Sequence, residues 1–249
     1  MKTFIKNNGL YIFGIIILFL LWEIIALLYN NDIVFPTIGE ISQSFIGDVI
    51  SANGLKVFLN TILRLLISIS ISVMLAVIMT VLSRFSIKIK KITTPLITIL
   101  KATPVAAFII IILVIIGHEK SSTIISILVM FPILYEGFYN SCNAISNDIK
   151  DEVKTISKVN ISVLKKVYLP IMMPYIITCF LQTISLGVKS LIMAELITQP
   201  KYSIGRELLQ YKNALNMSGI LAWTMVLIII LIVVEIVLNN IKNKIEKQI

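Results

Sequence analysis

Apolar runs of roughly twenty residues recur along this sequence, and they constrain its fold more than any other feature. A helix needs about 20 residues to cross the roughly 30 Å hydrocarbon core of a bilayer. Hydrophobic residues make up 57% of the chain and charged residues only 14%, whereas a soluble domain carries charge on about a quarter of its residues. The pattern therefore predicts an all-α polytopic membrane protein.

About six runs could serve as transmembrane helices. The fourth is short and only weakly apolar, so five spans is the competing count. Pro104 and Pro132 fall inside the third and fourth runs, where neighbouring helices can accommodate a proline. The predicted spans are Leu10–Leu28, Phe58–Leu82, Leu96–Ile116, Thr123–Tyr139, Ile171–Ile197 and Gly219–Leu238.

One polar stretch, from Asp148 to Pro174, interrupts the apolar sequence in its second half. Apolar residues within it recur at spacings of three and four, from Val153 to Val167, so a helix would have one apolar and one charged face. Pro170 and Pro174 predict that the helix does not continue undisturbed beyond this stretch. We therefore predict a pair of short amphipathic helices outside the bilayer.

Positive charge gathers on one side of the predicted spans. When both termini, the polar stretch and the loop at 84–91 are placed on one side, Lys and Arg exceed Asp and Glu by ten there, and the opposite side sums to zero. Cytoplasmic loops are enriched in Lys and Arg. Both termini and the polar stretch are therefore predicted to be cytoplasmic. The net charge of +9 is explained by topology rather than by nucleic-acid binding.

The polar stretch also carries a family resemblance. Its pattern D-E-V-x3-S-x9-V-x-L-P resembles the E-A-A-x3-G-x9-I-x-L-P cytoplasmic loop of binding-protein-dependent ABC importer permeases. Asp replaces the Glu of that motif, and Ser replaces its turn glycine, which adopts positive φ at lower cost. The resemblance assigns ATPase coupling to Asp151, Glu152, Val153, Ser157, Val167, Leu169 and Pro170.

Shorter matches follow in the same order as in permeases for sulfonates, nitrate, taurine and thiamine precursors. Phe35-Pro36-Thr37 and the mixed segment after it, to about Asn53, resemble the first outer loop of that group and predict a short interfacial helix. The run from Thr94 to Ala106 resembles the third span. Ala194-Glu195 resembles the end of the penultimate helix, and the segment after Tyr202 resembles a short outer helix.

The resemblance implies the type I (MetI-like) importer permease fold. Its transporter domain would occupy 54–240, preceded by a first transmembrane helix and outer segment at 1–53 and followed by a basic cytoplasmic tail at 241–249. The first apolar run lacks a following cleavage site and is expected to be a retained span rather than a signal peptide. The implied partners are a second copy of the chain, a cytoplasmic ABC ATPase dimer and an extracytoplasmic solute-binding protein, in a bacterial cytoplasmic membrane.

Motifs for catalysis are missing from the sequence. There is no G-x4-G-K-[ST] loop to hold nucleotide phosphates, and no H-E-x-x-H, C-x-x-C or G-x-S-x-G. A single histidine, His118, and two separated cysteines form no catalytic or metal-binding set. We therefore expect a transport subunit that is not an enzyme and holds no cofactor or metal, with ATP and Mg²⁺ bound by the partner ATPase.

Four ionisable residues in or near the spans are candidates for lining a solute pathway. Charge at membrane depth is costly, so such residues pair with one another or face water. Near a span end, a long basic side chain can instead reach the interface. The candidates are Arg64, Lys101, Lys189 and Glu195.

Two other functions remain open at this point. The first is an ion-coupled secondary transporter with Lys189 and Glu195 as relay groups, although a spacing of six residues places them on different faces of a helix. The second is a membrane scaffold or sensor without transport. Gradient-driven uptake without ATP would indicate the secondary transporter, and copurification with an ATPase would indicate the importer.

The predicted topology can be tested by labelling in a cysteine-free background. We expect Lys158→Cys to react with a membrane-impermeant maleimide only after the cells are permeabilised, because the charge distribution places this loop in the cytoplasm. Tyr202→Cys, in a predicted outer loop, should react in intact cells. Labelling of Lys158→Cys in intact cells would contradict the topology.

Overall fold

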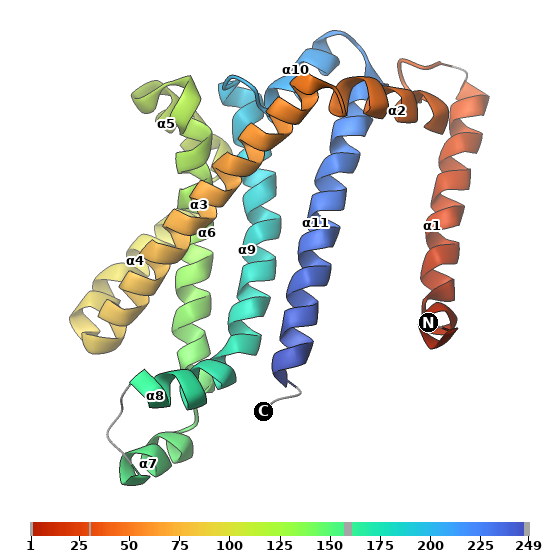
Figure 1. Cartoon of the computed structure of the whole chain (residues 1–249). Coiled ribbons are helices and arrows are strands. Elements are labelled where there is room, and N and C mark those ends of the chain that lie inside the picture. Colours follow the sequence, from red (N-terminus) through yellow and green to blue (C-terminus); the bar gives the residue numbers. More distant parts are fainter. Residues whose placement is uncertain (1, 30, 157–160, 247–249) are drawn as a thin grey trace.

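The computed structural model describes residues 2–29, 31–156 and 161–246, and no strand occurs in these ranges. Figure 1 shows long helices side by side, with short helices at both ends. The elements are α1 (Lys2–Tyr29), α2 (Ile38–Ser44), η1 (Phe45–Val49), α3 (Ala52–Phe85), α4 (Ile87–Ala102), α5 (Val105–Ile116), α6 (His118–Ser141), η2 (Cys142–Ala144), α7 (Asn147–Ile156), α8 (Ile161–Val163), η3 (Leu164–Tyr168), α9 (Leu169–Thr198), α10 (Ile204–Asn213) and α11 (Met217–Glu246).

Within the described residues, four helical stretches are long and apolar enough to cross a membrane: Ala52–Phe85, His118–Ala144, Leu164–Thr198 and Met217–Ile245. The second of these stretches contains the predicted fourth span, Thr123–Tyr139, which looked short and only weakly apolar in the sequence. The helical stretch extends beyond it at both ends and is long enough to cross a membrane. The bent pair α4 and α5 makes a fifth span if it is counted as one. In α1, the described apolar part is Ile16–Tyr29.

The predicted span Leu96–Ile116 is not one continuous helix. The chain bends by 99° between α4 and α5, and Thr103 and Pro104 lie at the corner in extended conformations. A proline disfavours helical geometry in the residue before it and donates no N–H, so the helix ends here instead of continuing. Pro132, by contrast, is accommodated inside α6 as predicted.

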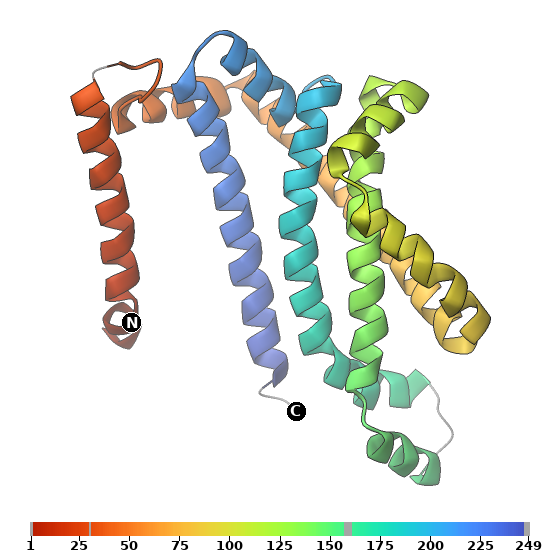
Figure 2. The same ribbon diagram turned by 180° about the vertical axis from the view of Figure 1, so that it is seen from behind.

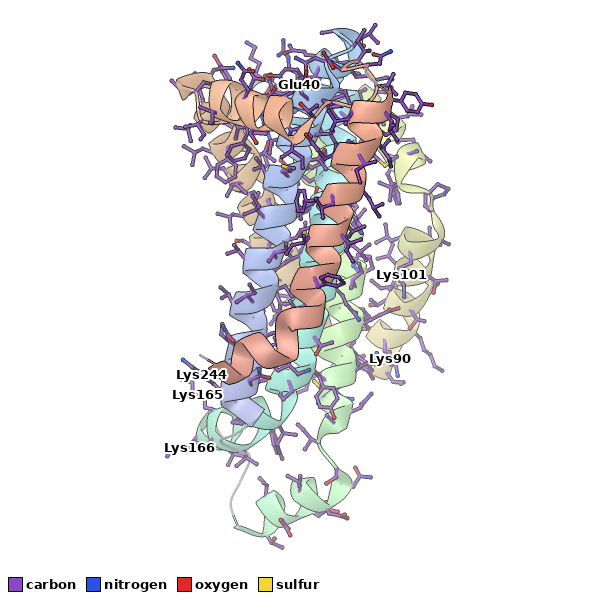
Figure 3. All side chains as sticks on the ribbon, turned by 90° about the vertical axis from the view of Figure 1, so that its right-hand side faces the viewer. Glu40, Lys90, Lys101, Lys165, Lys166 and Lys244 are labelled. Carbon is purple, nitrogen blue, oxygen red and sulfur yellow. The ribbon has the colours of Figure 1, made fainter. Side chains whose placement is uncertain are left out.

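The ends of the bundle separate the predicted sides of the membrane. Figure 1 places the start of α1, the end of α11 and the α7–α8 pair at one end, which we call the α7–α8 end. The helices α2 and α10 lie at the opposite end, here the α2–α10 end, and Figure 2 shows the same separation from behind. Figure 3 shows Lys165, Lys166 and Lys244 near the α7–α8 end and Glu40 at the other. The segments grouped by charge in the sequence are therefore grouped in space.

A short helix, α2, occurs in the segment where one was predicted. Thr37 caps it through a reciprocal pair of hydrogen bonds with Glu40: the Glu40 N–H donates to Thr37 Oγ1 at 3.3 Å, and the Thr37 N–H donates to Glu40 Oε2 at 2.8 Å. Such a capping box satisfies two N–H groups that the helix cannot. The Ile38 N–H also donates to Glu23 Oε2 at 2.9 Å, which ties α2 to α1.

Helix α6 lies at the centre of the bundle and packs against α3 through small polar residues. Ser68 Oγ donates to the Thr123 carbonyl at 3.1 Å, and Ser72 Oγ donates to the Ile127 carbonyl at 3.4 Å. Both serines and Ala76 are fully buried. Small residues let two helices approach closely inside a membrane, where apolar burial gives no preference for protein over lipid.

The contact between α6 and α9 is closest at Gly137. A Cβ atom at this position would overlap Cys179 Sγ and would lie 2.7 Å from Cys179 Cβ. Cys179 is itself buried. A side chain at residue 137 would therefore force the two central helices apart.

We expect Gly137→Ala to lower the free energy of unfolding by about 1–3 kcal/mol, because it overpacks this contact. Thermal unfolding in detergent measures the effect. Gly47→Ala is the matched control, since a Cβ there has no neighbour within 4 Å. Adding Cys179→Ala should recover part of the loss, and equal unfolding temperatures for Gly137→Ala and Gly47→Ala would contradict the packing described.

Candidate functional site

The polar stretch forms the predicted helix pair at the α7–α8 end. The first helix is α7, and the second consists of α8 and η3 and leads directly into α9. Ser157, which takes the place of the turn glycine in the motif, lies outside the described residues. The pair thus connects α6 to α9, the two central helices of the bundle.

The candidate coupling residues differ in their exposure. Asp151, Glu152 and Leu169 are exposed, whereas Val153 is buried in the chain. Val153 therefore does not offer a docking contact in this conformation, which the helical periodicity of α7 alone did not show.

A surface groove lies where η3 meets α9. It has a volume of about 450 Å³. Val167 and Pro170, both from the predicted set, line it, and Leu164 beside it is 50% exposed. The other lining residues, which the motif did not identify, are Lys165, Lys166, Ile171, Met173 and Ile245, together with Leu169 of the predicted set. The groove therefore offers an apolar floor with lysines at its edge.

Pro170 disturbs the helix at this groove but does not end it. The Leu169 N–H donates to the Leu164 carbonyl, five residues back, so η3 is a π-turn that runs on into α9. Pro170 has no N–H to give to the Lys166 carbonyl, and a local π-turn is one way to absorb that loss. Pro174 then lies within α9. The groove and the membrane helix consequently form one continuous rod, Leu164–Thr198.

A second polar cluster lies near the α2–α10 end and joins Arg64 of α3 to Glu195 of α9. Arg64 Nη1 donates to Glu195 Oε1 at 3.2 Å. Thr61 Oγ1 donates to the same carboxylate at 3.1 Å, and the Gly205 N–H donates to Glu195 Oε2 at 3.2 Å. The Glu195 side chain is fully buried, and that of Arg64 is 13% exposed. We call these four residues the Arg64–Glu195 cluster.

The Arg64–Glu195 cluster also holds the loop between α9 and α10. Arg64 donates to the carbonyls of Lys201 at 2.8 Å and Tyr202 at 3.2 Å. The Lys201 N–H in turn donates to Glu119 Oε1 of α6 at 3.0 Å. Three membrane helices and the outer loop are thereby joined through one guanidinium and two carboxylates.

Gly205 is required at its position in this cluster. A Cβ there would overlap the backbone N of Leu196 and would come within 2.5 Å of Glu195 Cβ. Backbone atoms cannot move aside as a side-chain tip can. The absence of a side chain lets the start of α10 lie directly on the end of α9 and donate its N–H to the carboxylate.

The two other candidates lie elsewhere. Lys101 Nζ of α4 donates to Glu136 Oε2 of α6 at 2.6 Å, with side chains 47% and 42% exposed. Figure 3 shows Lys101 on α4, farther from the α7–α8 end than Lys90. Lys189 is exposed on α9 and has no ion-pair partner among the described residues. Lys189 and Glu195 therefore occupy different surroundings. The sequence did not predict Glu136 as the partner of Lys101, Thr61 as a partner of Glu195, or Glu119 as a partner of Arg64.

The surface beside α10, at the α2–α10 end, carries acidic groups close together. Burial raises the pKa of Glu207 above its ordinary value; Arg206 acts in the opposite direction, and the Asp48 carboxylate raises it further. A groove of about 510 Å³ next to this region is lined by Asp32, Glu40 and Asp48 among other residues. This end of the chain therefore offers negative as well as positive groups to a partner.

Removing one charge of the Arg64–Glu195 cluster should be costly. We expect Arg64→Met to lower the free energy of unfolding by about 3 kcal/mol or more, because it leaves a buried carboxylate without its cation. The double variant Arg64→Met with Glu195→Leu should lose less than the sum of the single variants. Unfolding in detergent gives the coupling energy of this cycle.

The half-exposed pair provides the matched control for that experiment. Lys101→Met with Glu136→Leu should show a coupling of about 1 kcal/mol or less, because water screens an exposed pair. Equal coupling energies in the two cycles would contradict the structural role assigned to Arg64 and Glu195.

Comparison with known proteins places the chain in context. The family model described as "Binding-protein-dependent transport system inner membrane component" matches residues 68–248. No curated protein matches the sequence.

Solved structures share the fold at low sequence identity. A chain of the structure titled "Inward facing conformations of the MetNI methionine ABC transporter: CY5 native crystal form" is 14% identical, with a TM-score of 0.60 over 77% of this chain and 93% of that one. A chain of the "CY5 SeMet soak crystal form" is 13% identical, with a TM-score of 0.63 over 82% and 96%.

Proposed function

Because this chain belongs to the family of binding-protein-dependent transport system inner membrane components, we propose that it is the permease subunit of an importer driven by separate ABC ATPases. The shared fold with the methionine ABC transporter structures supports the importer architecture. The observation that carries the coupling role is the continuity between the exposed groove at η3 and the membrane helix α9.

The coupling segment acts as follows in this proposal. A cytoplasmic ATPase receives the α7–α8 segment through Leu164, Leu169 and the acidic residues of α7, in the manner of a helix docked into a groove. Closure of the ATPase dimer on ATP moves the segment. Since Leu164–Thr198 is one rod, the movement reaches the Arg64–Glu195 cluster at the other end of α9. The cluster would then transmit the tilt of α9 to α3 and to the outer loop.

The remaining partners follow from the same architecture. A second copy of the chain would provide the other half of the pathway, and a solute-binding protein would dock at the α2–α10 end. The solute would be small, of the sulfonate, nitrate, taurine or thiamine-precursor kind. The complex would lie in a bacterial cytoplasmic membrane with both termini and the α7–α8 end in the cytoplasm.

The ion-coupled alternative is not favoured. Its proposed relay needs Lys189 and Glu195 to exchange protons along one path, yet Glu195 is buried in an ion pair with Arg64 and Lys189 is exposed on another face of α9. Uptake that required ATP would separate the importer from both alternatives.

The coupling surface can be tested at Leu164. The cognate ATPase is expressed together with the permease. We expect Leu164→Asp to reduce copurification of this ATPase by about tenfold, because the substitution places a charge in the centre of an apolar contact. Quantitative pull-down from detergent-solubilised membranes measures the ratio of ATPase to permease.

Ile46→Asp is the matched control for this test. Ile46 is 66% exposed at the α2–α10 end, so the same change there should leave ATPase binding unaltered. If Leu164→Asp retained the wild-type ratio of ATPase and normal ATP-dependent uptake, coupling through this surface would be wrong.

A further inference from the structure

The exposed face of α9 is polar over most of its length. Between residues 170 and 198 its exposed residues recur at spacings of three and four, so they lie on one face of the helix. They are Tyr175, Thr178, Gln182, Leu186, Lys189 and Met193. We call this set the α9 stripe. Four of its six residues are polar, although α9 is a membrane-spanning helix.

The neighbouring helix α3 shows the opposite pattern. Its buried face consists largely of Ser, Thr and Ala, and its exposed residues in the middle of the span are almost all aliphatic, Met74 and Ile78 among them. The exposed residues in the middle of α11, such as Ile232 and Val233, are likewise mostly aliphatic, with Glu235 as the exception. Those faces suit hydrocarbon. The α9 stripe does not, because an amide or ammonium group facing lipid loses its hydrogen bonds to water.

Further polar groups adjoin the α9 stripe. A cleft of about 1030 Å³ between α6 and α9 is lined by Thr178 and Gln182 of the stripe and by Glu136 and Asn140 of α6. Lys101 of α4 reaches the rim of this cleft through its ion pair with Glu136. A second cavity, of about 430 Å³, is lined by Gln182 and Leu186 of α9 and by Glu235 of α11. The polar surface therefore extends from the stripe to α4, α6 and α11.

We propose that the α9 stripe is one wall of a water-filled solute pathway and that Lys189 is its recognition cation for a small solute with an anionic group. This inference rests on the proposed transport function and assigns the pathway within it. The second copy of the chain in the importer forms the opposite wall, which completes a passage that a single copy leaves open on one side.

The charge assignment follows from the partners of the other cations. Arg64 is bound by Glu195 and two carbonyls, so it offers no free charge to a solute. Lys101 is paired with Glu136. Lys242, which lines the same cleft as the stripe, donates to Thr178 Oγ1 at 3.4 Å. Lys189 has no carboxylate within 4 Å among the residues that the structure describes. A sulfonate or carboxylate moving along the stripe therefore meets an uncompensated positive charge at Lys189.

Thiol labelling in the assembled transporter tests the wall. In a background with Cys142→Ser and Cys179→Ala, we expect Gln182→Cys and Thr178→Cys to react with a charged methanethiosulfonate at least about tenfold faster than Met74→Cys. All three residues are exposed in the single chain, but only a thiol in water ionises readily and meets the reagent. The reaction rates are measured with and without ATP, so that a conformational change driven by ATP does not hide the accessibility of these positions.

Reagent charge tests the role of Lys189. At Leu186→Cys, one helical turn away, adding Lys189→Gln should lower the ratio of the reaction rate of the anionic sulfonatoethyl reagent to that of the cationic trimethylammonioethyl reagent, by about threefold at physiological salt and more at low salt. Adding Lys189→Arg should leave this ratio unchanged. A ratio unchanged by Lys189→Gln would overturn the charge assignment.

The outcomes separate this inference from the proposed function. If Gln182→Cys and Thr178→Cys react no faster than Met74→Cys in a complex that still copurifies with its ATPase, the pathway assignment is wrong and the importer stands. If the stripe reacts as expected but no ATPase copurifies and uptake needs no ATP, the importer is wrong and the water-filled wall stands.

Discussion

A polar group at membrane depth must find a partner or water, and this requirement organises the whole chain. Helix α3 meets it by turning Ser68 and Ser72 toward carbonyls of α6, so that mostly aliphatic side chains remain on its exposed face. The Arg64–Glu195 cluster meets it by enclosing a carboxylate among three donors, Thr61, Arg64 and the Gly205 N–H, near the end of α9. The α9 stripe has no comparable set of partners within one chain, which is why it is the natural place for water.

The same requirement links the two ends of the molecule. Helix α9 runs without a break from the groove at η3 to Glu195, because the π-turn before Pro170 absorbs the missing N–H without ending the helix. This continuous helix therefore connects the surface proposed for the ATPase to the cluster that holds the loop between α9 and α10.

Similarity to the methionine ABC transporter structures concerns the fold, and the chain's own side chains determine what the pathway recognises. Among the described residues, Arg64 pairs with Glu195 and Glu119, and Lys101 pairs with Glu136. These pairs differ in strength because their burial differs. A buried pair fixes helices in place, while the half-exposed Lys101–Glu136 pair can be broken at lower cost. Lys189, unpaired and on a polar face, has the surroundings expected of a group that contacts solute.

Local pattern in the sequence was enough to predict the helical class, a short helix in the segment that holds α2, the amphipathic pair at the α7–α8 end and the grouping of positive charge at that end. These features depend on residues close together in the chain or on sums over a loop. The sequence did not predict the bend at Pro104, the burial of Val153, or the separate surroundings of Arg64 with Glu195 and of Lys189. Those features depend on which helices become neighbours. Arg64 and Glu195, for example, are 131 residues apart in the chain. Only the packing of α3 on α9 decides whether a charge in the membrane is enclosed by partners or left facing a passage.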